Sequence, residues 1–193
     1  VFAAENSLAM GSYGLLGKQN LYEHSMRVPL ILSGKGIPKN QKSDAFVYLF
    51  DLFPTFCKML NIATPNDLEG KDLSGIIQGK TQSVREQVFT AYTFSQRAIR
   101  DRRWKLIRYP KVDFIQLFDL QTDPYEINNL AHKPEHAAKV KTMMEDLKKH
   151  QQQYGDTFPL TAAEISSQVF DYKNVVRKPD QWQPKEVLEK YFK

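Results

Sequence analysis

The chain has 193 residues, of which 41% are hydrophobic and 25% are charged, the composition of an ordinary folded protein. Its 27 Lys and Arg and 22 Asp and Glu leave a net charge of +5, and no apolar run reaches the roughly 18 residues of a membrane span. We therefore expect neither a nucleic-acid nor a membrane partner. The single cysteine, Cys57, excludes an intrachain disulfide and a cysteine zinc site, and its apolar helical surroundings favour a buried, inert thiol.

The first thirty residues carry the most informative pattern. Residues 1–4 and 28–32 are short apolar runs bounded by polar or Gly-rich segments, which predicts two buried strands. Glu5 and Asn6 follow the first run directly, and a Gly-rich stretch then leads to Lys18. Carboxylate and amide oxygens suit a hard cation such as calcium or magnesium, and a lysine after glycines can approach an anion. An anion site beside a metal ion therefore competes with a solvated surface turn.

His24 lies in the same segment, between Glu23 and the basic Arg27. A histidine titrates near neutral pH, so His24 could serve as an acid–base group or contact a substrate. A hydrogen-bonded structural role fits the sequence equally well, and both alternatives stay open. Arg27 is interpreted as a structural ion-pair partner.

The following stretch contains loops and short regular elements. Residues 45–49 are predicted to form a strand. Asp51 can cap the helix that begins after it, with Pro54 tolerated in the first turn. Asp72 can start a short helix that ends before Gly79.

The pattern changes near Arg85, where β-rich segments follow one another closely. Four strands are predicted, at residues 88–92, 97–99, 105–109 and 115–120. Such close spacing implies an antiparallel meander, since parallel strands need long crossover connections.

The middle of this meander holds the densest basic cluster of the chain, formed by Arg97, Arg100, Arg102, Arg103, Lys105 and Arg108. We interpret it as the solvated face of a hairpin. Two alternatives are phosphate-and-stacking contacts with Trp104 and Tyr109, and a basic wall facing an anionic substrate.

Helical spacing returns at residues 134–154. Pro134 suits the first turn, Gly155 suits the stop, and one apolar stripe is expected to pack against the meander: Ala137, Val140, Met143, Met144 and Leu147. In the tail a short amphipathic helix could dock through Trp182, Val187, Leu188, Tyr191 and Phe192.

These motifs together resemble the formylglycine-dependent sulfatase family. ENSLAMGSYGLLGKQNLYEHSMRVPLIL is similar to the family's metal-ligand pair, Gly-x-x-Gly-Lys and Arg-Val-Pro. FDLFPT resembles its Asp-x-x-Pro-Thr element, and LEGKDLSGIIQG its Asp-Gly-x-Asp-Leu segment. AIRDRRWKLIRYP and LFDLQTDPYEINNLA resemble its C-terminal hairpin and its Asp-Pro-x-Glu, Asn-Leu signature. The succession of motifs covers most of residues 1–150 in consistent order.

The resemblance implies an α/β fold, in which a mixed-sheet catalytic domain precedes a small antiparallel sheet packed with a helix. Residues 1–86 are then the end of the catalytic α/β domain. Residues 87–193 are the C-terminal subdomain, made of the antiparallel meander, the long helix and the tail.

The resemblance also implies sulfate-ester hydrolysis, in which a formylglycine hydrate attacks sulfur beside a calcium ion. Glu5 and Asn6 take the two adjacent metal-ligand positions, and Lys18 takes that of the lysine that contacts the sulfate. His24 remains a further substrate-contact candidate. The implied substrate is a sulfated small molecule or glycan, and full-length relatives are expected to be periplasmic, secreted or lysosomal.

The sequence departs from the family pattern in three ways. It contains no Cys/Ser-x-Pro-x-Arg, so we expect the nucleophile to come from an N-terminal part of the catalytic domain and the chain alone to be inactive. Glu5 and Ser7 stand where Asp and Gly are usual, which changes the metal geometry. Tyr13 stands where many relatives have His.

Two alternatives to a sulfatase follow from the same residues. Phosphonate and phosphodiester hydrolases share the metal site and much of the C-terminal pattern. A non-catalytic, degenerate sulfatase-like module would be consistent with Glu5, Ser7 and Tyr13.

Overall fold

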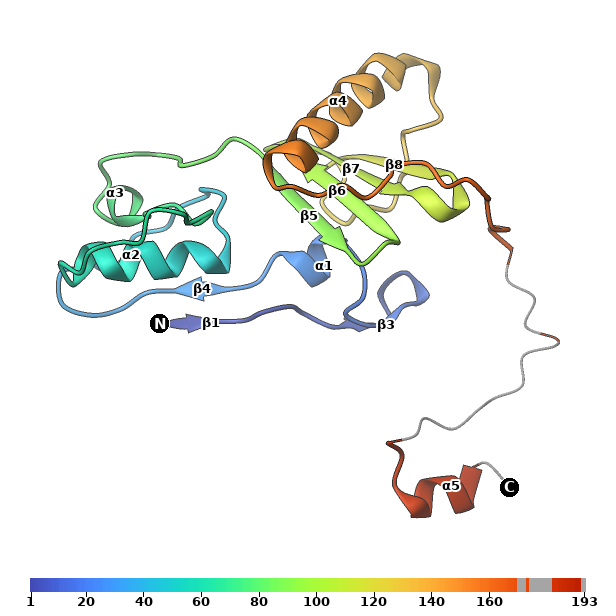
Figure 1. Cartoon of the computed structure of the whole chain (residues 1–193), viewed down its shortest axis with the longest axis horizontal. Coiled ribbons are helices and arrows are strands. Elements are labelled where there is room, and N and C mark those ends of the chain that lie inside the picture. The colour runs from blue at the N-terminus through green and yellow to red at the C-terminus, as the bar shows by residue number, and fades with distance from the viewer. Residues whose placement is uncertain (170–172, 174–181, 192–193) are drawn as a thin grey trace.

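The computed structural model describes residues 1–169, 173 and 182–191. Its main element is a four-stranded antiparallel sheet in the order β5-β6-β7-β8 (Figure 1). The strands are β5 (Val88–Tyr92), β6 (Gln96–Arg100), β7 (Trp104–Tyr109) and β8 (Phe114–Asp119), with η3 (Pro110–Val112) between the last two. The predicted meander is confirmed, with its middle turn closed by the Asp101 carboxylate, which accepts from the Trp104 amide at 2.5 Å.

One face of the sheet is covered by α4 (Ala137–Gln153), which follows η4 (Pro134–His136) (Figure 1). The cross-strand pair Ile99–Leu106 and the buried Leu117 meet Met143 and Leu147 in one apolar cluster. Met143 therefore packs in the core, as its helical spacing predicts. The predicted small antiparallel sheet packed against a helix is confirmed.

The opposite face is covered by residues 20–26, including α1 (Glu23–Met26), which lies on the other side of the sheet from α4 (Figure 1). Here the pair Ala98–Ile107 and Phe118 pack against Leu21. The two central strands are therefore buried on both sides, and the N-terminal segment is held by the sheet that it covers.

The solvated-face interpretation of the basic cluster is wrong for three of its six members. Arg97, Lys105 and Arg108 are each at most 4% exposed. Layers on both sides of the sheet exclude water from these side chains, so carboxylates from other segments neutralise them. Arg97 pairs with Asp156 at 2.7 Å, and Arg108 pairs with Asp113.

At each edge of the sheet, a single side chain forms hydrogen bonds with backbone groups of the edge strand. At β5 the Tyr48 hydroxyl accepts from the Phe89 amide at 2.7 Å and donates to the Phe89 carbonyl at 2.9 Å. At β8 the Asn129 side chain accepts from the Leu117 amide and donates to the Ile115 carbonyl, each at 3.0 Å. Backbone groups that would otherwise pair with another chain are thus satisfied within this one.

The N-terminal strands form, although their predicted burial is wrong. β1 (Phe2–Ala3) pairs antiparallel with β4 (Leu30–Ile31), while Phe2 is 62% and Ile31 57% exposed. Within the described residues this pair has no third strand, and the side chains of Phe2 and Ile31 stay exposed. Between them the Gly-rich stretch folds as a small hairpin, made of β2 (Ala9–Met10), η1 (Ser12–Gly14) and β3 (Leu16–Gly17).

The predicted strand at residues 45–49 does not form. The Phe46 carbonyl accepts from the Arg85 guanidinium at 3.0 Å, and the Tyr48 amide donates to the Asp51 carboxylate at 2.7 Å. Side chains thus satisfy backbone groups that a strand would have paired in a ladder. The chain continues into η2 (Leu49–Asp51), α2 (Leu52–Met59) and α3 (Ser74–Ile77), close to the predicted helices.

Asp51 precedes α2, as expected, but its carboxylate does not cap α2; it accepts from the Tyr48 amide and so caps η2 instead. It is fully buried and binds the Arg85 guanidinium through both oxygens, at 2.5 and 2.7 Å. The Lys71 amide donates to the same carboxylate at 2.8 Å. This buried carboxylate therefore joins three segments of the chain while it also caps η2.

The tail forms the predicted helix, α5 (Lys185–Tyr191), but this helix buries no residue. Trp182 is 82% exposed, and Phe192 lies outside the described residues. Cys57 is buried and carries a free thiol, as predicted. Among residues 1–169, 173 and 182–191, no helix is long and apolar enough to cross a membrane.

Candidate functional site

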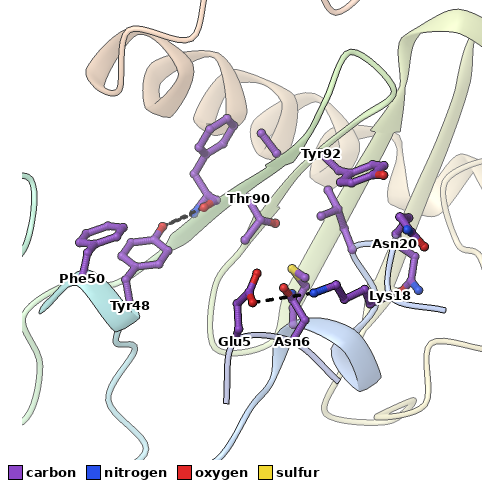
Figure 2. A pocket seen from close by; sticks show the side chains of 13 residues that line it. Glu5, Asn6, Lys18, Asn20, Tyr48, Phe50, Thr90 and Tyr92 are labelled. Atoms are coloured by element: carbon purple, nitrogen blue, oxygen red, sulfur yellow. Dashed lines mark hydrogen bonds and ion pairs between the residues drawn. The ribbon is translucent and has the colours of Figure 1, made fainter. Parts of the chain in front are cut away.

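A cleft of about 620 Å³ opens between the N-terminal segment, Tyr48 and strand β5, and we call it the charged cleft. Glu5, Asn6 and Lys18 all line it, and Figure 2 shows the three side chains close together on one side. Three of the four residues singled out from the sequence are therefore brought to one site.

The backbone around the hairpin explains this proximity. β1 ends just before Glu5, and the β2–β3 hairpin returns the chain so that Lys18 follows directly after it. Gly17 adopts φ +98°, and a Cβ there would lie 2.9 Å from the Gln19 side-chain oxygen, so the turn favours glycine. As a result, Lys18 Nζ lies 3.8 Å from Glu5 Oε2.

This ion pair is open to solvent, with the Lys18 side chain 48% and the Glu5 side chain 79% exposed. A pair at this distance and exposure stabilises a fold by about 0–1 kcal/mol, because water screens the charges. Both charges are therefore accessible to a ligand, the lysine to an anion and the carboxylate to a cation.

Asn6 is held by α1. Its Nδ2 donates to the Ser25 carbonyl at 3.5 Å, and the Ser7 amide donates to the same carbonyl at 3.1 Å. Ser25 is fully buried, so its carbonyl is held in place by the surrounding residues. With Nδ2 engaged, the Asn6 side-chain oxygen is the group left to bind a cation.

A buried charge cluster fixes α1 in turn. The Glu126 carboxylate accepts from the Glu23 amide at 2.6 Å, and Lys105 Nζ lies 2.8 Å from Glu126 and 3.0 Å from Glu23. Burial raises the pKa of Glu126, although Lys105 opposes the shift. The sheet and the loop after β8 thus position the segment whose Ser25 carbonyl holds Asn6.

His24 does not line the charged cleft. Its ring lies 5.2 Å from the Tyr13 ring and 5.8 Å from the Tyr22 ring, in an aromatic stack against the sheet. Among the described residues, neither of its ring nitrogens has a hydrogen-bond partner. Burial, with the nearby Lys105, lowers the pKa of His24, so a neutral ring is favoured here.

The donor set at the charged cleft fits part of a calcium site. Calcium takes six to eight oxygen ligands, and Glu5 and Asn6 offer a carboxylate and an amide oxygen side by side. Within the described part of the chain, no group of three or more His, Cys, Asp or Glu could hold a metal ion. Two such oxygens are fewer than the six to eight that calcium takes, so Glu5 and Asn6 alone do not complete a calcium site.

Several residues of the charged cleft were not predicted from the sequence, among them Tyr48, Phe50 and Thr90 (Figure 2). No local motif marks them, since they reach the cleft only because Tyr48 pairs with β5. Burial raises the pKa of Tyr48, so its hydroxyl stays protonated and continues to donate to the Phe89 carbonyl.

Comparison with known proteins identifies relatives of this chain. Residues 11–153, more than half of the chain, match the family described as N-sulphoglucosamine sulphohydrolase, C-terminal. An N-acetylglucosamine-6-O-sulfatase from Bacteroides thetaiotaomicron is 30% identical over 172 residues, covering 82% of this chain and 31% of that protein. The chain therefore spans about a third of the length of this relative.

Solved structures agree with these sequence matches. One, a complex with its substrate D-glucosamine-2-N,6-O-disulfate, aligns with a TM-score of 0.73 and 27% identity over 82% of this chain and 35% of that one. The phosphonate monoester hydrolase of Agrobacterium radiobacter aligns with a TM-score of 0.70 and 26% identity, over 79% of this chain and 34% of that one. The matched residues, the antiparallel sheet with its helix and these relatives together show that the chain belongs to the sulfatase family, through its C-terminal domain.

Proposed function

We propose that this chain acts in sulfate-ester hydrolysis as the C-terminal part of a sulfatase, where it forms one wall of the active site. The observation that carries the proposal is the convergence of Glu5, Asn6 and Lys18 on one cleft, with Lys18 Nζ 3.8 Å from the Glu5 carboxylate. Family membership supports the reaction class, and the exposed opposite charges support binding of an anion beside a cation.

In this proposal Glu5 and Asn6 provide two calcium ligands, and Lys18 contacts the sulfate group. A bound calcium ion would neutralise charge on the sulfate oxygens as a Lewis acid. The Lys18 ammonium adds a second positive charge, and its flexible stem lets it leave Glu5 for the anion. The sequence has no Cys/Ser-x-Pro-x-Arg, so the nucleophile is assigned to residues outside this chain.

The substrate class proposed is a sulfated glucosamine or a glycan that contains one. Support comes from the two relatives named for such compounds, one an N-acetylglucosamine-6-O-sulfatase and the other bound to D-glucosamine-2-N,6-O-disulfate. The size of the charged cleft, about 620 Å³, is in the range of small-molecule sites.

The test is sulfate release from D-glucosamine-2-N,6-O-disulfate by the full protein that carries this chain. We expect activity that a calcium chelator removes and added calcium restores. Asn6→Ala should raise the calcium concentration needed for half-maximal activity by at least about tenfold, because the loss of even an outer partner of a metal ligand has an effect of that size. Asn66→Ala, in an exposed loop, is the matched control.

Two results would contradict the proposal. One is unchanged calcium dependence in Asn6→Ala, and the other is full activity in the presence of chelator. The purified 193-residue chain by itself should release no sulfate from an aryl sulfate, and turnover by it would overturn the assignment of the nucleophile to other residues.

A second candidate is hydrolysis of phosphonate or phosphate diesters. The likeness to the phosphonate monoester hydrolase, at a TM-score of 0.70 and 26% identity, favours it. The ratio of kcat/KM for a sulfate ester to that for a phosphonate monoester separates the two reactions. A ratio below one would assign the protein to the second.

A third candidate is a non-catalytic, degenerate sulfatase-like module. The packing of Tyr13 favours it, because its ring lies tilted against that of Tyr22, with centroids 4.8 Å apart, and its hydroxyl donates to the Tyr125 carbonyl. Tyr13 thus makes packing contacts at a position where many relatives have His. Calcium titration of the full protein discriminates, since a degenerate module would show no saturable binding.

A further inference from the structure

A second cleft, of about 300 Å³, adjoins the charged cleft and shares Gln19 and Asn20 with it. We call it the amide cleft. Its other walls include Tyr22 from the α1 segment, Gln96 from β6 and Tyr109 from β7. The proposed function of the charged cleft uses none of these three side chains.

The lining of the amide cleft has a consistent chemistry. It combines the aromatic rings of Tyr22, Tyr109 and Phe114 with the side-chain amides of Gln96 and Gln116. Among the described residues it includes no carboxylate, ammonium or guanidinium group. Aromatic faces suit the C–H face of a sugar ring, and amides donate to and accept from hydroxyls, so this lining favours an uncharged, hydroxyl-rich ligand over an anion.

Hydrogen bonds hold part of the amide cleft in place. Gln116 Oε1 accepts from the hydroxyls of Tyr22 and Tyr109, both at 2.9 Å. Burial raises the pKa of Tyr109, so this hydroxyl keeps the proton that it donates. The two rings and the amide thus form a fixed platform rather than independent, mobile side chains.

One polar atom of the amide cleft is left unsatisfied. Gln96 Nε2 donates to the Gln19 carbonyl at 3.3 Å, but Gln96 Oε1 is buried and has no hydrogen-bond partner among the described residues. Buried acceptors without a partner are uncommon in folded proteins and call for an explanation. Rotation of the Gln96 side chain toward the cleft would let a ligand hydroxyl donate to this oxygen.

We propose that the amide cleft binds an uncharged sugar unit of a glycan whose sulfated unit occupies the charged cleft. The proposal rests on the proposed function for the identity of the neighbouring unit. Its volume of about 300 Å³ has room for one monosaccharide, and the shared Gln19 and Asn20 place the two units next to each other. The chain would then recognise an oligosaccharide rather than a single sulfated sugar.

The test is titration of the full protein that carries this chain, ¹⁵N-labelled at glutamine, with N-acetyl-D-glucosamine, an uncharged probe, while the side-chain amide signals of Gln96 and Gln116 are followed by NMR. We expect saturable shifts of both signals. Gln96→Met keeps the length of the side chain and removes its polar atoms, so it should weaken the apparent affinity by at least about tenfold. Gln152→Met, at an exposed position on α4, should leave the affinity unchanged.

Each result bears on one claim. Linear, unsaturated shifts at Gln96 and Gln116, or equal affinity in Gln96→Met and Gln152→Met, would refute the sugar subsite. Lys18→Ala should not alter binding of the uncharged probe, because Lys18 lines only the charged cleft. Failure of sulfate release with intact N-acetyl-D-glucosamine binding would instead refute the proposed function and leave the subsite in place.

Discussion

Two ion pairs in this molecule have the same chemistry and opposite surroundings. Arg85 and Asp51 are 5% and 0% exposed and meet through two bonds of 2.5 and 2.7 Å. Lys18 and Glu5 are 48% and 79% exposed and lie 3.8 Å apart. The first pair is held inside the fold by several hydrogen bonds, while both residues of the second line the charged cleft.

The contrast separates charges that build the fold from charges that can bind a ligand. Removing one partner of a buried pair leaves an uncompensated charge without water, whereas an exposed partner is simply rehydrated. Stability and ligand binding should therefore respond to mutation at different pairs.

The largest effect on stability is expected at the buried pair. Asp51→Ala leaves the Arg85 guanidinium without a carboxylate and removes the acceptor of two backbone amides, so we expect the free energy of unfolding to fall by about 3–5 kcal/mol. Urea unfolding measures this loss. Asp67→Ala, at an exposed loop position, serves as the control and should change stability by less than about 0.5 kcal/mol. Equal effects of the two substitutions would show that the buried pair does not anchor the fold.

A smaller effect is expected at the cluster that holds α1. Glu126→Gln removes the charge that pairs with Lys105 while Glu23 remains, so we expect a loss of about 1–3 kcal/mol. The specific consequence is faster hydrogen exchange at the Glu23 amide, which donates to Glu126. Glu145→Gln, on the exposed side of α4, is the matched control. Unchanged exchange at Glu23 would mean that Glu126 does not position this segment.

Sequence patterns predicted the parts of the fold that depend on neighbours along the chain. Closely spaced β segments predicted the meander, and the stripe containing Met143 and Leu147 predicted the helix face that packs on it. The same patterns could not predict the partners of Arg85 and Lys105, because those carboxylates lie 34 and 82 residues away in Asp51 and Glu23.

The site was predictable to a similar extent. Glu5, Asn6 and Lys18 form a local motif, and they do converge on one cleft. Tyr48 and the β5 residues enter that cleft through a side-chain-to-strand pairing that no periodicity reports. The amide cleft likewise needs β6, β7 and the α1 segment together, so it becomes visible only after folding.

A still smaller effect concerns pH. The pKa of His24 is lowered by burial and by Lys105, so between this value and about 6.5 the unfolded chain binds a proton that the folded chain does not. The contribution of the neutral His24 ring to the free energy of unfolding is therefore fully present above about pH 6.5. It is lost as the pH falls through the folded pKa of His24. Thermal melts of the wild type and of His24→Phe between neutral and acidic pH test this. The variant should lose part of the pH dependence, and identical curves would contradict the burial of a neutral ring.

The smallest effect on stability is expected at the exposed pair. Lys18→Ala removes a screened interaction, so the free energy of unfolding should change by no more than about 1 kcal/mol. Urea unfolding of Lys18→Ala and of Lys35→Ala, an exposed loop lysine, should give nearly the same midpoint. A loss comparable to that of Asp51→Ala would assign Lys18 to the fold instead of the cleft.

The central claim is that Lys18 serves a sulfated ligand, and kcat/KM for sulfate release from D-glucosamine-2-N,6-O-disulfate tests it most directly. In the full protein that carries this chain, Lys18→Ala should lower this value by about 10²–10³-fold, the usual effect of removing one group that stabilises charge in the transition state. Lys35→Ala should leave it unchanged. Equal kcat/KM in Lys18→Ala and the wild type would contradict the account.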